Sequence, residues 1–308
     1  MSDSAAELSV VVLCYDDRST VLAAVESLLR QGSPQVEVVV VASGGFGEAQ
    51  LVAERYPEIK VFDSPQRLLP GGARNRGIEC SLGKVVAFLA ADCLAGEGWV
   101  AKRLDAHRRG HRAVASAVTL APPFRPWSFG AHLLMYPDRF PTRQPGMVEP
   151  PDAAVHGMSL ARDLLDQVGP YREDLRIGED TEMAERIDAS GERIFFEPSI
   201  QTLHRGPRST RAMLSDQFRR GARSVPYRSG FRGHSLTLGK VALRRSFRRV
   251  RYSLRSVKGV SEAERLKIAV AVPWLVAASL AYHLGMWVTQ ARARRSLGPR
   301  PLDERIGR

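Results

Sequence analysis

The stretch Pro70–Cys93, with the sequence PGGARNRGIECSLGKVVAFLAADC, decides the fold class of this chain. A glycine-rich turn opens a predicted helix, and the apolar run KVVAFLA that follows is typical of a strand buried on both faces. This run stops on a single carboxylate, Asp92, which comes after two alanines. A helix joined by a short link to a fully buried strand predicts an α/β architecture with a parallel sheet.

The same alternation of strand and helix extends upstream to the start of the chain. Buried-strand runs occur at 8–15, 36–42 and 59–64, and the helical patterns between them end at Gly32 and Pro57. We therefore predict a mostly parallel sheet that is flanked by helices on both faces. Sheets of this type bind ligands outside the carboxyl ends of their strands. The side chains expected at those ends are Asp16, Ser43, Asp63 and Asp92.

Residues 98–204 show a mixed pattern. The predicted elements are a helix at 98–110, a strand at 111–121, a helix and turn at 161–174, a helix at 178–191 and a strand pair at 192–204. The segment 122–151 is rich in proline and aromatic residues, and we predict an irregular loop over the site.

The cysteine content narrows the class of protein. The chain has 308 residues and three cysteines, Cys14, Cys80 and Cys93, none of which forms a CxxC pair. This spacing argues against a disulfide framework and a zinc knuckle, and it suits a reducing compartment. No basic residue precedes the first apolar run, so a signal peptide is not expected.

Positive charge is concentrated in the last third of the chain. Residues 201–308 contain 24 of the 45 Lys and Arg residues but 5 of the 33 Asp and Glu residues. The net charge is +12 for the whole chain, +19 for this third and −7 for residues 1–200. Such asymmetry predicts an anionic surface as partner. Because no platform of aromatic residues accompanies the arginines, we expect a membrane surface and no nucleic acid.

Two segments of this basic third have the composition of membrane-associating helices. In residues 238–259 apolar residues recur at steps of four and three, and arginines fill the other faces, which indicates a basic amphipathic helix. Residues 268–288 form an apolar stretch of 21 residues without Asp, Glu, Lys or Arg, long enough to span a bilayer of roughly 30 Å. Arginines on both sides of this stretch conflict with a single span. A re-entrant or interfacial segment, a hairpin broken at Pro273 and a helical subdomain packed on the rest of the chain remain open alternatives.

Three ordered blocks resemble the family-2 glycosyltransferases, which have the GT-A fold. Residues 9–31 are similar to the opening strand and helix of that family. Pro70–Cys93 is similar to its A-R-N-x-G-I helix and to the strand that ends in a D-x-D motif. Residues 169–204 are similar to its G-E-D helix and to the late strand that ends in a histidine. The resemblance implies a glycosyltransferase domain at 1–208, with a nucleotide-binding half at about 1–98 and an acceptor half at about 99–208, followed by a basic helical region at 209–308.

The resemblance also implies a reaction. A sugar would pass from a nucleotide-activated donor to an acceptor hydroxyl with inversion at the anomeric carbon. We expect the acceptor to be a lipid-linked or envelope glycan, at the cytoplasmic face of the plasma membrane. The diphosphate leaving group needs charge stabilisation, normally from a divalent cation such as Mg²⁺ or Mn²⁺ that is held by oxygen ligands. The acceptor hydroxyl needs a carboxylate base within hydrogen-bond reach.

Roles for individual residues follow from the matched motifs. Asp92 would bind the cation, and His204 matches a late histidine that reaches the metal or the diphosphate. Asp180 would be the general base, and Glu179 would position the acceptor or orient that base. The residues expected on the nucleotide side are Asp16, Ser43, Gly72, Arg74 and Asn75.

The chain departs from the family pattern in the donor pocket. The D-x-D motif reads Ala90-Ala91-Asp92, so its first acid is absent. The second strand ends in Ala42 and Ser43, where the family has two acids. A changed donor, a weaker or absent cation, and a non-catalytic binding or scaffold protein on the membrane are all compatible with these losses.

Overall fold

A nine-stranded sheet forms the centre of the computed structural model, which describes residues 6–150, 157–227 and 238–296. The strands are β1 (Leu8–Cys14), β2 (Val36–Ser43), β3 (Lys60–Ser64), β4 (Val85–Ala90), β5 (Cys93–Ala95), β6 (Ala113–Leu120), β7 (Gly146–Val148), β8 (Ser159–Ala161) and β9 (Ile194–His204). Their order is β3-β2-β1-β4-β8-β6-β9-β5, and β7 pairs with β9. The first four of these are mutually parallel, whereas β8 is antiparallel to both β4 and β6. The mostly parallel sheet predicted from the sequence is therefore confirmed.

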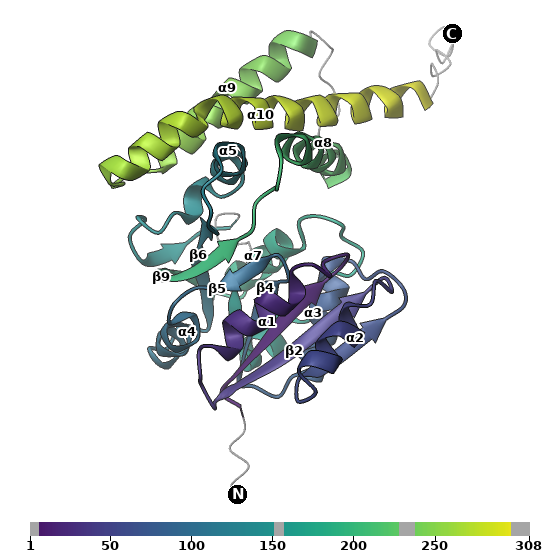
Figure 1. Cartoon of the computed structure of the whole chain (residues 1–308), viewed down its shortest axis with the longest axis vertical. Coiled ribbons are helices and arrows are strands. Elements are labelled where there is room, and N and C mark those ends of the chain that lie inside the picture. The colour runs from purple at the N-terminus through teal and green to yellow at the C-terminus, as the bar shows by residue number, and fades with distance from the viewer. Residues whose placement is uncertain (1–5, 151–156, 228–237, 297–308) are drawn as a thin grey trace, which may run out of the picture.

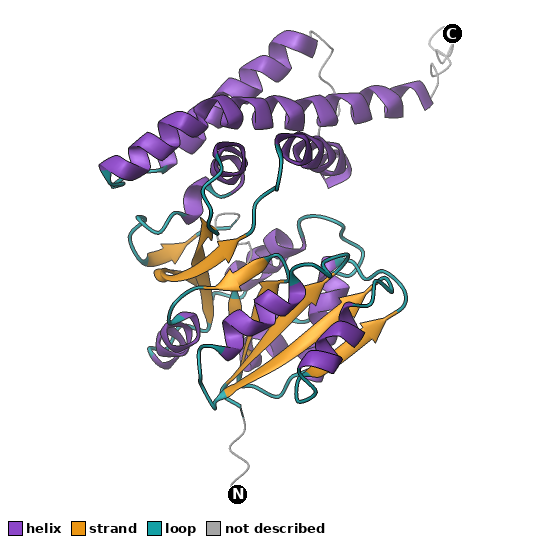
Figure 2. Ribbon diagram, in the orientation of Figure 1, coloured by secondary structure: helices purple, strands orange, loops and turns teal. Residues whose placement is uncertain are grey.

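Helices cover both faces of the sheet (Figures 1 and 2). Helices α1 (Val21–Leu29), α2 (Glu48–Arg55) and α4 (Trp99–Arg108) pack on one face, and α3 (Pro70–Cys80), α6 (Arg162–Val168) and α7 (Glu179–Ala189) pack on the other. Successive side chains of a strand point to opposite faces, so Val10 joins the first core and Val11 the second. Because both faces are covered, the strands read as unbroken apolar runs in the sequence.

The interpretation of residues 122–151 as an irregular loop is wrong. This segment contains α5 (Pro126–Met135), a short 3₁₀ turn η1 (Pro137–Arg139) and strand β7. Pro126 occupies the first turn of α5, where its missing N–H costs no hydrogen bond. A Cβ on Gly130 would lie 2.6 Å from the backbone nitrogen of Leu275, so α5 packs very closely on another helix. That helix contains Leu275, 145 residues further along the chain, which is why the local sequence does not reveal α5.

The strand pair predicted at 192–204 is also wrong, because the segment is the single long strand β9. Its register with β6 shifts between Ser116 and Ala117, which pair with Glu197 and Gln201. Pro198 lies in the unpaired interval, where its missing N–H breaks no ladder bond. The irregularity therefore bends one strand and does not end it.

The C-terminal helices form a layer at the end of the molecule opposite the N-terminus (Figure 1). They are α8 (Thr210–Tyr227), α9 (Leu238–Ser256) and α10 (Glu262–Ser296). Helix α10 continues through Pro273, so a hairpin broken at this residue is ruled out. One stripe of α10, which includes Ala271, Leu275 and Ala278, is fully buried against α5 and its neighbours. The described residues contain one helix long and apolar enough to cross a membrane, at 262–292, and 28% of its apolar window is buried.

The stripe predicted to make α9 amphipathic is divided in the structure. Val250, Leu254 and Val257 pack into the protein interior. Leu243 and Phe247 remain 46% and 59% exposed. Only the first part of the apolar stripe is therefore available to an external partner.

Candidate active site

The carboxyl ends of β2, β1 and β4 meet at one edge of the sheet. Cys14 pairs with Ala42, and Leu13 pairs with Ala90, so the residues that follow these positions lie side by side. Asp16 has φ of 59°, a left-handed backbone conformation that an aspartate tolerates at a tight turn. Ser43 is buried, at 2% exposure. The strand-end side chains named from the sequence thus share one edge of the sheet.

Two further acids lie at this edge and were missed by sequence reasoning. The backbone nitrogen of Asp17 donates a 2.8 Å hydrogen bond to Oε1 of Glu48, a buried residue in the first turn of α2. Burial, followed by the charge of Asp92, raises the pKa of Asp17 to about 6. The signal for Asp17 was present in the Asp-Asp pair that follows the first strand. Asp92 is therefore not an isolated carboxylate, because its charge acts on Asp17, which follows β1.

Asp92 and His204 are brought together by an antiparallel pairing. Strand β5 pairs with β9 so that Cys93 lies opposite His204. The backbone nitrogen of Arg205 donates to the carbonyl oxygen of Asp92 at 2.8 Å. As a result, Nε2 of His204 lies 3.4 Å from Oδ2 of Asp92, and the carboxylate is 40% exposed. The Tyr136 ring packs edge-on against the imidazole, with 5.5 Å between ring centroids.

These two side chains fit one mode of cation binding. Mg²⁺ is commonly held by one or two protein ligands, with the remaining positions filled by substrate phosphates and water. Within the described ranges, no group of three or more His, Cys, Asp or Glu side chains could hold a metal ion by itself. The donor set therefore suits a cation that arrives with a phosphorylated substrate, and it does not suit a structural metal site.

A buried arginine binds the acidic pair at the start of α7. Nη1 of Arg74 lies 2.8 Å from Oε1 of Glu179, and Nη2 lies 2.8 Å from Oδ1 of Asp180. Both acids lie in the first turn of the helix, where the helix dipole favours negative charge. Arg74 is 5% exposed, and the two carboxylates raise the pKa of its guanidinium above its ordinary value.

The two acids differ in accessibility. The side chain of Glu179 is 9% exposed and that of Asp180 is 22% exposed. Burial and the neighbouring Asp180 charge raise the pKa of Glu179, although Arg74 acts in the opposite direction. Asp180 is thus the carboxylate that an external hydroxyl can reach, whereas Glu179 is mainly engaged with the arginine.

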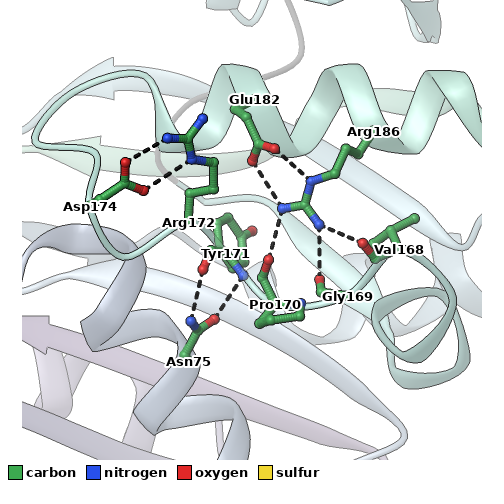
Figure 3. Close-up of polar contacts among 9 residues, drawn as sticks. All are labelled: Asn75, Val168, Gly169, Pro170, Tyr171, Arg172, Asp174, Glu182 and Arg186. Carbon is green, nitrogen blue, oxygen red and sulfur yellow. Dashed lines mark hydrogen bonds and ion pairs between the residues drawn. The ribbon is translucent and has the colours of Figure 1, made fainter.

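The loop before α7 is hydrogen-bonded to side chains of two helices, Asn75 of α3 and Arg186 of α7 (Figure 3). Asn75 of α3 donates from Nδ2 to the carbonyl of Tyr171 at 2.9 Å and accepts from the Tyr171 nitrogen at 2.8 Å. From the other side, the Arg186 guanidinium donates to the carbonyl oxygens of Val168, Gly169 and Pro170. The bonds of Asn75 therefore position the loop that leads into α7, whose first turn carries the acids. Its contact with a nucleotide stays a prediction.

Two glycines of α3 have different reasons for being glycine. A Cβ on Gly71 would lie 2.0 Å from the carbonyl oxygen of Arg172, so this residue permits the close approach of the loop. A Cβ on Gly72 would meet nothing closer than 3.6 Å, from the Glu173 side chain. The geometry gives no steric demand for glycine at Gly72, whose predicted role beside the nucleotide stays a prediction.

Aromatic side chains lie beyond the end of β2, next to Ala42 and Ser43, the positions where the family has two acids. The Tyr15 ring packs edge-on against Phe46, with centroids 5.2 Å apart, and the Arg67 guanidinium lies over Tyr15 at 4.0 Å. Tyr15 and Phe46 are 37% and 40% exposed. This group was not singled out from the sequence, because its members follow three different strands.

Helix α8 presents basic residues to the same region. Arg220 donates to Oδ2 of Asp216 at 2.7 Å. Burial opposes the charged form of its guanidinium, but the negative charges of Asp216 and, more weakly, Asp92 raise its pKa. The pKa of Arg223 is lowered by burial and by nearby arginines, Arg176 foremost. Positive charge from the C-terminal helices therefore faces the acidic strand ends.

Comparison with known proteins shows which family the chain matches. The family model described as glycosyl transferase family 2 matches residues 9–169. A succinoglycan biosynthesis protein of Rhizobium meliloti is 35% identical over 92 residues, which are 29% of this chain and 26% of that protein. The chain spans about a quarter of the length of the curated relatives that match it at 29% to 35% identity.

Solved structures show the same fold at low sequence identity. A mannosyltransferase from Pyrobaculum calidifontis, in complex with GDP-mannose and Mn²⁺, superposes with a TM-score of 0.59 at 18% identity, covering 94% of this chain and 88% of that one. The S. aureus protein TarS, in complex with UDP-GlcNAc, gives 0.54 at 15% identity, covering 94% and 92%.

Fold and matched sequence together define a GT-A glycosyltransferase. The chain belongs to glycosyl transferase family 2, and the family and fold predicted from the sequence are confirmed.

Proposed function

We propose that this enzyme transfers a sugar from a nucleotide-sugar donor to an acceptor hydroxyl with inversion, and that Asp180 is the general base. The observation that carries the proposal is the Arg74–Glu179–Asp180 arrangement, in which Asp180 is the more exposed acid. The acceptor oxygen attacks the anomeric carbon on the face opposite the nucleoside diphosphate. The bond from that carbon to the diphosphate oxygen breaks, and the acceptor proton passes to Asp180. A single displacement of this kind inverts the anomeric centre.

The other two members of the arrangement serve Asp180. Arg74 holds one oxygen of the base, which leaves the second oxygen to accept a hydrogen bond from the acceptor. Glu179 takes the other arm of the guanidinium and so fixes the direction of Arg74. A buried ion pair of this geometry fixes the orientation of the base before the acceptor arrives.

Asp92 and His204 would hold the divalent cation, Mg²⁺ or Mn²⁺, together with the donor diphosphate. A cation bound there supplies charge stabilisation to the leaving group. The solved mannosyltransferase of the same fold binds GDP-mannose together with Mn²⁺, which supports a divalent cation beside the donor in general. The nearby charge of Arg220 is positioned to add to it, since the electrostatic influence of Asp92 reaches this side chain.

Base recognition and acceptor class are further parts of the proposal. Tyr15 and Phe46 offer apolar surface against which the nucleotide base could pack. In the family pattern, acids at this place would recognise the base by hydrogen bonds. The apolar helix α10 and the succinoglycan biosynthesis relative support a lipid-linked or envelope glycan as acceptor, at the cytoplasmic face of the membrane.

The experiment is a donor-hydrolysis screen across nucleotide sugars, combined with calorimetry of nucleoside diphosphates with and without Mn²⁺. We expect Mn²⁺-dependent binding that Asp92→Asn weakens at least tenfold. Asp105→Asn is the matched control, because Asp105 is an aspartate of α4 whose side chain is 67% exposed beside Arg109. Equal losses in the two variants, or binding unaffected by Mn²⁺, would remove Asp92 from the cation site.

A second function is favoured by one specific observation. Ala42, Ser43 and Ala90 replace acids of the donor pocket, as they would in a relative that kept the fold as a binding or scaffold protein. Such a protein would bind no nucleoside diphosphate under any of these conditions.

A further inference from the structure

The C-terminal helices expose an apolar groove. Eight of the fourteen exposed large apolar side chains in the described residues lie on α8, α9 and α10. Leu214, Leu243, Leu280 and Leu284 line a single groove of about 1230 Å³ between these three helices, with Trp287 beside them. Exposed apolar side chains that gather in one groove, in contrast to ones scattered singly, are a feature of interaction sites.

A basic pocket of about 650 Å³ adjoins this groove. Its lining residues are Arg245, Arg248, Arg249, Arg251, Tyr252 and Arg255 of α9 and Tyr282, His283 and Met286 of α10. His283 also lines the apolar groove, so the two surfaces are continuous. No Asp or Glu occurs in residues 238–256 or 265–296, so the surface that α9 and α10 form here has a strong net positive charge. This charge beside the apolar groove suits a partner that offers apolar surface next to negative charge.

The groove lies on the side of α8 that faces away from the candidate active site. Leu214 and Phe218 line the groove, whereas Asp216 and Arg220, two positions further in each case, are coupled to Tyr136 and the strand ends. Positions two apart on a helix differ by about 200° around its axis. A partner bound in the groove therefore leaves the donor site accessible.

Packing argues against α10 as a membrane span. A Cβ on Gly221 of α8 would lie 1.8 Å from the Tyr282 carbonyl oxygen, and one on Gly285 would lie 2.0 Å from the Phe218 carbonyl oxygen. Helix α5 makes an equally close contact through Gly130, near Leu275. These contacts hold one face of α10 against helices that adjoin the catalytic part, along most of its apolar length. Only the opposite face is free to meet lipid.

We propose that the apolar groove and the basic pocket are an interfacial docking surface for a bilayer of anionic phospholipid. Acyl chains fill the groove, headgroup phosphates bind the α9 arginines, and α10 lies in the plane of the interface without crossing it. Leu243 and Phe247, the exposed part of the α9 stripe, add to the inserted surface. The inference deepens the proposed function, because it places the catalytic site beside a membrane-borne acceptor.

Vesicle co-sedimentation of the full chain, with no nucleotide sugar present, tests this inference separately from sugar transfer. We expect binding to phosphatidylcholine vesicles containing 30% phosphatidylglycerol and little binding to pure phosphatidylcholine. Each basic residue near the surface contributes about fivefold to the partition coefficient. Replacing the three residues Arg248, Arg251 and Arg255 by Gln should therefore lower this coefficient roughly 100-fold. The control is the Arg30, Arg76 and Arg109 to Gln variant, whose arginines are 46% to 70% exposed on the catalytic part. It should change binding less than threefold.

The contribution of the apolar groove is tested by a second variant and its control. Leu284→Gln should reduce binding roughly tenfold, whereas Leu82→Gln, at a leucine 69% exposed outside the C-terminal helices, should not. Leu284→Met should restore binding, which separates lipid contact from misfolding. Carbonate at high pH should release the wild-type chain from native membranes. Retention after carbonate, equal effects of the two arginine triplets, or preference for duplex RNA over anionic vesicles would each overturn the inference.

Discussion

Replacing Arg74 by methionine tests the ion-pair arrangement that holds the proposed base. Methionine keeps much of the side-chain volume but leaves Glu179 and Asp180, with side chains 9% and 22% exposed, without their shared cation. Removing one partner of a buried ion pair costs about 3–5 kcal/mol. Arg74→Met should therefore lower the free energy of unfolding in urea by about that amount at pH 7.

Arg76→Met on the same helix is the control. Arg76 pairs with Glu79, and the two side chains are 46% and 57% exposed. Such a surface pair contributes about 0–1 kcal/mol. If Arg74→Met cost less than about 1 kcal/mol, or no more than Arg76→Met, the buried ion pair would not be holding the start of α7.

Two further predictions follow from the packing. Gly71→Ala should destabilise the protein by about 1–3 kcal/mol, because its Cβ would meet the Arg172 carbonyl oxygen, whereas Gly72→Ala should be neutral or slightly stabilising. Equal melting temperatures of the two variants would contradict this reasoning. His107 is held neutral, since burial and then Arg103 lower its pKa to about 3. The unfolded imidazole titrates near 6.5, so its contribution to stability is complete above that pH and falls by about 2 kcal/mol by pH 5. His107→Gln should flatten the acid limb of the stability profile, and an unchanged limb would refute the assignment.

The sequence was sufficient for those parts of the fold that local patterns encode. The first four strands are buried on both faces, so each appears as a continuous apolar run, and their short links leave few topologies. Asp92 and Asp180 were predicted as site residues because each falls in a matched motif at a strand end or helix start, and their roles stay predictions. The proximity of Asp92 and His204 was expected from the resemblance, and the pairing of β5 with β9 gives it a physical cause.

The rest depends on contacts between residues far apart in the chain. Helix α5 is packed on α10, so nothing in residues 122–151 alone reveals it. Arg74 was predicted beside the nucleotide from its match to the A-R-N motif, and this role stays a prediction. Its ion pairs with the acids of α7 could not be foreseen, because Glu179 lies 105 residues further along the chain. The same holds for the stack of Arg67 on Tyr15, which joins the ends of two different strands. Such groups become visible only when the sheet brings its edges together.

Sugar transfer by Asp180→Asn, measured with the donor identified by the screen, tests the central claim most directly. Asparagine keeps the shape of the side chain and one acceptor oxygen for Arg74 but cannot take the acceptor proton. Turnover should fall at least about 100-fold, as expected for loss of a general base. The affinity for the nucleoside diphosphate should stay within experimental error of wild type, and the protein should remain folded with a lower melting temperature, because Arg74 loses one of its two anionic partners. Retained transfer in this variant would show that Asp180 is not the base.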